Sequence, residues 1–191
     1  GDTKVVPKGA VDKIFINTTG IGEIIANPVP SGESARPGDA ILVTGSVGDH
    51  GLAILSTRQG LSFGTPVLSD AASLNHSIAR LLKAVPEIHV LRDPTRGGLA
   101  TTVNEIALSS KVCCELDEEA IPVRPEVHGG CSFLGLDPLY LANEGKFLCF
   151  LPEALADKAL EVLRADPLCA GAVRIGTVTD AHPGKVVLKT P

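Results

Sequence analysis

Residues 88–98, Ile-His-Val-Leu-Arg-Asp-Pro-Thr-Arg-Gly-Gly, hold the side chains and the spacing best suited to chemistry in this chain. An apolar run predicts a strand over 88–91, a polar loop with paired glycines follows Arg92, and an amphipathic pattern predicts a helix from Leu99. Backbone N–H groups and the positive end of a helix dipole meet at such a junction, where anions bind well. The loop lacks the glycine spacing of the common nucleotide-binding loops, so it indicates a less common kind of phosphate chemistry.

Two further polar clusters interrupt the apolar framework, Gly-Asp-Thr-Lys at 1–4 and Asn-Glu-Gly-Lys at 143–146. Each of the three clusters also has a purely structural interpretation. An Asp-Thr pair caps turns, Thr95 is a candidate N-cap for the helix near Gly97, and 143–146 could be the solvated tip of a hairpin. Taken singly, the clusters leave structure and function equally open.

Taken together and in order, four strings resemble the HypE family of hydrogenase maturation proteins, in the PurM-like (AIR synthase) superfamily. They are Gly-Asp-Thr-Lys at 1–4, Gly-Asp-His-Gly at 48–51, Asp-Pro-Thr-Arg-Gly-Gly at 93–98 and Ala-Asn-Glu-Gly-Lys at 142–146. The resemblance covers essentially the whole chain, and the last two strings are fairly specific for HypE within the superfamily.

The resemblance implies an ATP-dependent protein with ATP and Mg²⁺ as cofactors. Such a protein dehydrates a carbamoyl group on a C-terminal cysteine to a thiocyanate, the cyanide source for the iron centre of nickel–iron hydrogenases. The implied partners are a HypF-like carbamoyltransferase, a HypC–HypD-like scaffold and a second copy of the intact protein, which dimerises through its N-terminal domain.

The resemblance also assigns roles to single residues. Asp2 and Thr3 contact ATP or its Mg²⁺, with Asp2 as the metal ligand, and Lys4 stabilises the charge that develops on oxygen. Glu144 is the base that removes nitrogen protons, and Asn143 orients the group. The residues expected to line the phosphate region are Asp93, Thr95, Gly97 and Gly98, and Arg96 is expected to contact either phosphate or the adjoining domain.

The implied chemistry explains these residue types. A carboxamide oxygen is a poor leaving group, so it must first be phosphorylated, and phosphoryl transfer needs cations and donors that neutralise phosphate oxygens. Two nitrogen protons must then be lost, which requires a positioned base.

Composition narrows the remaining classes. The net charge is −5 and no basic run is present, which argues against nucleic acid or an anionic membrane as a partner. No signal peptide or long apolar segment is recognisable, so the cytoplasm is the expected location. Hydrophobic residues make up 44% of the 191 residues but aromatic residues only 3%, so Val, Ile, Leu and Ala must build the core.

Neither the cysteines nor the histidines show the spacing of a metal site. The five cysteines form no CxxC pair, so we expect reduced, mostly buried thiols. We expect Cys131 to be a packed core thiol as well, because no basic residue that could activate it stands beside it in the sequence. His76 and His182 are expected at the surface, and His50 and His128 adjoin glycines without an assigned role.

The elements that must position these residues follow from periodicity and from Gly and Pro signals. They predict an α+β domain with a mixed sheet covered by helices, and the resemblance implies a PurM-like C-terminal domain. The predicted strands are 40–44, 88–91, 112–116, 139–142, 147–151, 173–178 and 185–188, and the predicted helices are 50–58, 74–85, 99–107, a short one from Pro125, and 155–163. The pattern over 139–151 fits either two strands with a tight turn or one strand with a bulge around the polar tip.

Residues 1–37 are expected to be the end of an N-terminal ATP-binding domain, strand-rich over 1–25 and then a Pro/Gly linker, with the second domain at 38–191. We expect the chain to be a fragment, because the resemblance implies that most of the ATP-binding domain precedes Gly1 and that a tail ending in cysteine follows Pro191. Such a fragment is expected to fold but not to turn over alone.

Two alternatives stay open. One is a related ATP-dependent enzyme of the superfamily, a selenophosphate or amidine-forming synthase. The other is a non-catalytic domain on which maturation partners dock. Binding of labelled ATP to the intact protein distinguishes an enzyme from a docking domain.

Overall fold

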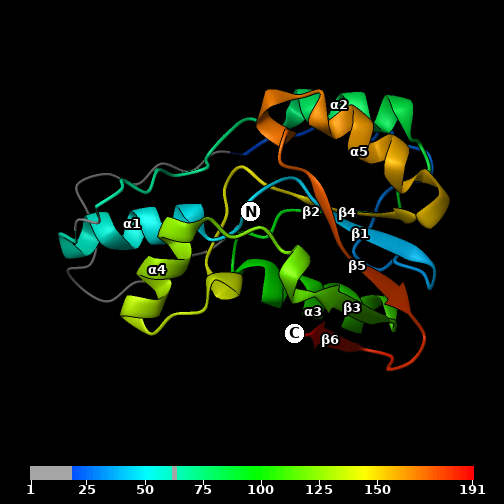
Figure 1. Ribbon diagram of the computed structural model, residues 1–191. Coiled ribbons are helices and arrows are strands. Elements are labelled where there is room, and N and C mark those ends of the chain that lie inside the picture. The colour runs from blue at the N-terminus through cyan, green and yellow to red at the C-terminus, as the bar shows by residue number, and fades with distance from the viewer. Residues whose placement is uncertain (1–18, 62–63) are drawn as a thin grey trace.

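The computed structural model describes residues 19–61 and 64–191, and it has a central sheet with helices on both faces (Figure 1). Most of the predicted strand-rich segment, residues 1–18, lies outside the described part, and 19–25 contain no helix or strand. The elements in chain order are β1 Asp39–Val43, α1 Asp49–Gln59, α2 Asn75–Ala84, β2 Val90–Arg92, α3 Gly98–Ser110, β3 Cys113–Asp117, η1 Glu118–Ala120, α4 Pro125–Leu134, η2 Pro138–Tyr140, β4 Leu148–Pro152, η3 Glu153–Leu155, α5 Ala156–Arg164, η4 Pro167–Cys169, β5 Val173–Thr179 and β6 Lys185–Lys189, where η marks a 3-10 helix.

The sheet is mixed and has the strand order β2-β4-β1-β5-β3-β6. Neighbouring strands are antiparallel except β3 and β6, which run parallel. β5 and β6 follow each other in the sequence but are not neighbours, because β3 lies between them. The architecture confirms the predicted α+β class with a mixed sheet covered by helices.

β1 shows why the sequence gives this layering. Ile41 and Val43 belong to the core cluster on the side of α3, and Ala40 and Leu42 belong to the cluster formed with α2 and α5. Successive side chains of a strand point to opposite faces, so a strand covered on both faces needs an unbroken apolar run. All five residues of β1 are buried, as the predicted strand requires.

The predicted helices are confirmed with small shifts at their ends. α1 lies between Gly48 and Gly60, which have positive φ angles of 88° and 66°, and α2 ends just before Val85 and Pro86. α4 begins at Pro125 as predicted, but it continues through the glycines that were expected to follow it. Glycine weakens a helix without preventing one when the helix packs on other elements. Within the described residues, no helix has the length and apolar character needed to cross a membrane.

The prediction of two strands, or of one bulged strand, over 139–151 is wrong in its first half. η2 and an irregular segment replace the first strand, and only β4 forms. Leu141 N–H donates to Pro138 O, and Ala142 O accepts a hydrogen bond from Gly51 N–H. These backbone groups therefore bond within their own turn and to α1 instead of to a neighbouring strand.

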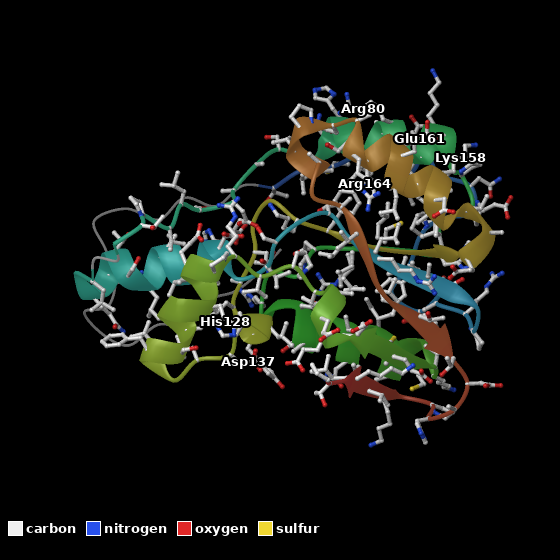
Figure 2. The ribbon with its side chains drawn as sticks, in the orientation of Figure 1. Arg80, His128, Asp137, Lys158, Glu161 and Arg164 are labelled. Carbon is white, nitrogen blue, oxygen red and sulfur yellow. The ribbon has the colours of Figure 1, made fainter. Side chains whose placement is uncertain are left out.

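A buried carboxylate, Asp166, joins α2 to the residues that follow α5; its partner Arg80 is labelled at the top of Figure 2. Asp166 accepts hydrogen bonds from the Ser77 hydroxyl and from the Arg80 guanidinium. The bond from Ser77 is the main cause that lowers the pKa of Asp166; the Leu168 N–H and Arg80 act in the same direction, and burial opposes them. A carboxylate with a lowered pKa stabilises the folded state above the pKa of the unfolded chain, and this contribution is lost as pH falls.

We therefore expect Asp166→Asn to flatten the acid side of the stability profile. The unfolding free energy of the wild type should fall more steeply than that of the variant as pH drops below about 4, the range in which unfolded aspartate titrates. Urea unfolding followed by circular dichroism at a series of pH values measures this. Asp157→Asn, at an exposed position of α5, is the control and should keep the wild-type slope. Parallel slopes for the wild type and Asp166→Asn would contradict the assignment.

Candidate functional site

Asn143 lies where three loops meet, and its side chain is fully buried. Its Oδ1 accepts a hydrogen bond from Gly48 N–H at 2.9 Å, and its Nδ2 donates to Pro94 O at 3.0 Å and to Leu141 O at 3.1 Å. Its own N–H donates to Pro94 O at 3.2 Å, and its carbonyl accepts from the Thr95 hydroxyl at 2.9 Å. One residue thus ties together three of the four polar strings of the sequence.

Two glycines allow the backbones to approach closely at this junction. Gly98 has a φ of +64°, and a Cβ there would lie 2.4 Å from Leu139 O and 2.6 Å from Leu141 O. A Cβ at Gly51 would lie 2.8 Å from Leu141 Cβ. The segment that follows η2 therefore packs directly against the first turns of α3 and α1, and it could not do so against larger residues.

Two residues that are predicted to line the phosphate region, Thr95 and Gly98, make hydrogen bonds inside the protein. Thr95 is not the N-cap of α3: the N-cap is Gly97, no side chain caps the helix, and the Thr95 hydroxyl bonds to Asn143 instead. Gly98 is buried, and its N–H donates to Thr95 O at 3.3 Å. The start of α3 is therefore covered on one side by the 139–141 backbone.

The remaining predicted residues of the described part lie at the surface of the junction. Asp93, Arg96, Gly97 and Glu144 are all exposed. Asp93 pairs at 2.9 Å with the neighbouring Arg92, the last residue of β2. Because the Thr95 hydroxyl donates to Asn143 O, the 93–98 loop lies beside the segment that carries the exposed Glu144.

Asp70 and Lys146 pack beneath the segment that carries Glu144, although neither is among the predicted site residues. The Asp70 carboxylate accepts a hydrogen bond from Glu144 N–H at 3.0 Å, and its other oxygen lies 3.5 Å from Lys146 Nζ. Lys146 stands inside a predicted polar string, but Asp70 is 74 residues away from Glu144 in sequence. No motif marks Asp70, so only the fold could identify it.

Asp2, Thr3 and Lys4 lie outside the described residues, so their predicted contacts with ATP, Mg²⁺ and the developing oxyanion stay predictions. Within the described part, no group of three or more His, Cys, Asp or Glu side chains is placed to hold a metal ion. Two exposed arginines, Arg92 at the end of β2 and Arg96, and the exposed backbone of Gly97 are groups of the kind that bind phosphate oxygens. Arg92 is already paired with Asp93 and Glu105, and Lys146 with Asp70.

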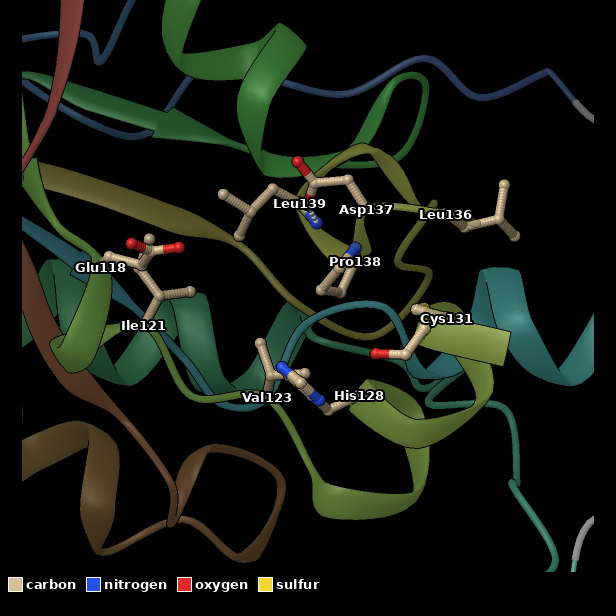
Figure 3. Close-up of a pocket in the computed structure, with 10 residues that line it drawn as sticks. Glu118, Ile121, Val123, His128, Cys131, Leu136, Asp137, Pro138 and Leu139 are labelled. Carbon is tan, nitrogen blue, oxygen red and sulfur yellow. Dashed lines mark hydrogen bonds between the residues drawn. The ribbon is translucent and has the colours of Figure 1, made fainter. Parts of the chain in front are cut away.

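A cavity of about 500 Å³ lies elsewhere, between α4, η1 and the residues around η2 (Figure 3). His128 and Cys131 of α4 face Pro138 and Leu139 across it, and none of the described predicted site residues lines it. Burial raises the pKa of the Cys131 thiol, and the charge of Asp137 adds to this effect. Cys131 is buried and packs with Leu52 and Val127, which confirms the prediction of a packed core thiol.

The other thiols and histidines also match their predicted places. All five cysteines are free and buried, and burial raises the pKa of Cys114 to about 12. His76 and His182 are exposed, as predicted. His50 contacts Ser69 at 2.9 Å, beside the segment that carries Asp70.

Comparison with known proteins gives a consistent family. The family model described as AIR synthase related protein, C-terminal domain, matches residues 36–189. The carbamoyl dehydratase HypE of Cupriavidus necator is 53% identical over 190 residues, which cover 100% of this chain and 54% of that protein. The chain spans about half the length of the curated relatives that it matches.

Solved structures agree with this family. The crystal structure of the hydrogenase maturation protein HypE in complex with ATP has a TM-score of 0.91 and 62% sequence identity, and the match covers 98% of this chain and 58% of that chain. The crystal structure of a HypE–HypF complex has a TM-score of 0.81 and 42% identity, covering 85% of this chain and 52% of that chain.

Proposed function

This chain belongs to the AIR synthase related family and to the HypE proteins within it, and from that premise we propose that it is part of an ATP-dependent carbamoyl dehydratase. The proposed reaction converts the thiocarboxamide of a C-terminal cysteine to a thiocyanate, for the cyanide ligands of nickel–iron hydrogenase. The observation that carries the proposal is the junction at Asn143, which places the exposed Glu144 beside the 93–98 loop.

ATP, when bound, supplies the phosphoryl group that makes the carboxamide oxygen a leaving group. We propose that the exposed part of the 93–98 loop lies against the phosphates, with Asp93, Arg96 and Gly97 in contact. Thr95 and Gly98 hold the loop in place through their contacts with Asn143 and with the 139–141 backbone. Asp2 and Thr3 are proposed to hold ATP or Mg²⁺ and Lys4 to stabilise the charge on oxygen, as the family resemblance implies.

Glu144 is the proposed base. Its side chain is exposed at the edge of the junction, so it can reach a substrate that approaches from solvent. Its carboxylate would accept one nitrogen proton as phosphorylation of the oxygen gives an imidate and release that proton to solvent. It would then accept the second proton as the carbon–oxygen bond breaks, phosphate leaves and the carbon–nitrogen triple bond forms. Asn143 orients Glu144 indirectly, because its buried amide fixes the loop on which Glu144 stands.

The partners and the domain division are proposals of the same kind. A HypF-like carbamoyltransferase is supported by the solved HypE–HypF complex, while a HypC–HypD-like scaffold and a homodimer rest on the family resemblance. We propose that residues 1–37 belong to a preceding ATP-binding domain, which is compatible with a family match that begins at residue 36. On this proposal the chain needs the rest of its protein for turnover. A cytoplasmic location is supported by five free cysteines, since disulfides are rare there.

The test is a dehydration assay on the full-length protein that contains this chain. With its C-terminal cysteine carbamoylated, the protein should lose one water from that cysteine when ATP is added, and mass spectrometry of the C-terminal peptide should show the thiocyanate. The same sample without ATP is the control. ATP binding with no mass change, or ATP-dependent product formation from selenide or an amide instead, would refute the proposal.

A further inference from the structure

The carboxylate of Asp70 is buried against the loop that carries Glu144. Its side chain is 5% exposed, and one oxygen accepts the Glu144 N–H at 3.0 Å. The other oxygen is buried without a hydrogen-bond partner among the described residues, and Lys146 Nζ lies 3.5 Å from it. A buried carboxylate is costly unless neighbouring charges or donors compensate it, so this placement has a structural cost that other interactions must offset.

The backbone of Asp70 also determines which residues the loop can contain. A Cβ at Gly145 would lie 1.7 Å from Asp70 O, so only glycine allows the two backbones to approach this closely. On the other side, the stem of Lys146 passes over Gly45, where a Cβ would lie 2.9 Å from Lys146 Cε. The tip at 144–146 is thus enclosed between the segment of Asp70 and the end of β1.

The hydrogen bond from Glu144 N–H to Asp70 links two irregular segments. Residues 64–74 connect α1 to α2 without a helix or strand, and residues 141–147 form no helix or strand either. No sheet or helix ladder fixes the distance between them, so the bond from Glu144 N–H to a charged acceptor is a principal constraint.

We propose that Asp70 is a positioning residue for the dehydration. It holds the main chain of Glu144, and through Lys146 the whole tip, so that the Glu144 carboxylate points at the place where the substrate nitrogen is deprotonated. This inference rests on the proposed function for its catalytic consequence, but the positional tie can be measured without turnover.

The experiment compares three variants of the full-length protein, Asp70→Ala, Asp70→Asn and, as a control, Asp166→Ala. Asp70→Ala removes both contacts, whereas Asp70→Asn keeps an oxygen acceptor for Glu144 N–H and loses the charge that faces Lys146. Asp166→Ala removes another buried carboxylate, one that joins α2 to the end of α5 and bonds to Ser77, Arg80 and Leu168 rather than to Glu144 or Lys146. It controls for loss of stability alone.

Two readouts are measured, amide hydrogen exchange at Glu144 and the kcat and KM(ATP) of dehydration. Asp70→Ala should exchange the Glu144 amide faster and lower kcat by roughly 10- to 100-fold with KM(ATP) little changed, because a small displacement of a catalytic group is costly. Asp70→Asn should keep slow exchange and recover part of kcat. Asp166→Ala should change neither readout.

If Asp70→Ala folds and keeps the wild-type kcat, the inference that Asp70 positions Glu144 for catalysis is overturned. If the Glu144 amide of Asp70→Ala exchanges at the wild-type rate, the inference that Asp70 holds the main chain of Glu144 is overturned. Should the wild type show no dehydration at all, the proposed function fails, and the exchange measurement still decides whether Asp70 holds Glu144.

Discussion

Glu144→Gln is expected to abolish dehydration while ATP binding stays intact. Glutamine has the same shape but accepts no proton at neutral pH, and removal of a general base typically costs about 10²- to 10⁴-fold in rate. The Glu144 side chain is exposed, and the hydrogen bond that ties this residue to Asp70 comes from its main chain, so the fold should not change. Stability should stay within about 0.5 kcal/mol of the wild type, as for most surface substitutions.

The measurement follows thiocyanate formation and nucleotide binding in the same full-length preparation. Glu161→Gln is the matched control, an exposed glutamate on α5 that Figure 2 shows far from the loops of the junction. It should leave both values unchanged. Unchanged thiocyanate output in Glu144→Gln would exclude the base role.

Asn143→Ala is expected to give the largest loss of stability at the junction. Without the amide, Gly48 N–H and Leu141 O lose their side-chain partner, and Pro94 O keeps only the main-chain bond from residue 143. Each buried polar group left without a partner costs about 1–3 kcal/mol, so we expect the unfolding free energy to fall by about 2–4 kcal/mol.

Urea unfolding followed by circular dichroism is the appropriate measurement, because the chain has no Trp. Asn104→Ala is the control: its Nδ2 donates to Ala100 O on the exposed side of α3, so its loss should cost at most about 0.5 kcal/mol. Equal destabilisation by both substitutions would show that the three loops do not depend on the buried amide.

The framework was predictable because burial dictates the pattern. β1 reads as an unbroken apolar run since both of its faces are covered, and α2 shows the 3.6-residue spacing of a helix with one buried face, at Leu81. The same reasoning gave a wrong prediction for the segment before residue 143. Leu139 and Leu141 are partly buried, but their backbone carbonyls face Gly98 and their register is not that of a strand. Apolar residues on both sides of a polar tip fit a hairpin and a crossing loop equally well.

The residues that belong to the site were easier to predict from the sequence than the contacts they make. The polar strings led to Glu144 and to the 93–98 loop, and the fold joins these two segments at Thr95 and Asn143. Neighbouring residues in the sequence do not show that Asn143 is buried or that Gly98 lies in close contact with another backbone. Both features depend on residues about 45 positions away. Asp70 is the extreme case, since an isolated aspartate between two helices carries no sequence signal.

The central claim is that the Glu144 carboxylate faces the substrate nitrogen while the 93–98 loop faces the phosphates. A crystal structure of the full-length protein with a non-hydrolysable ATP analogue and a carbamoylated C-terminal cysteine tests this most directly. We predict that the Glu144 carboxylate lies within a hydrogen bond, or one bridging water, of the carbamoyl nitrogen, with Gly97 beside the γ-phosphate. A carbamoyl group bound away from the junction at Asn143, with another residue at its nitrogen, would contradict the account.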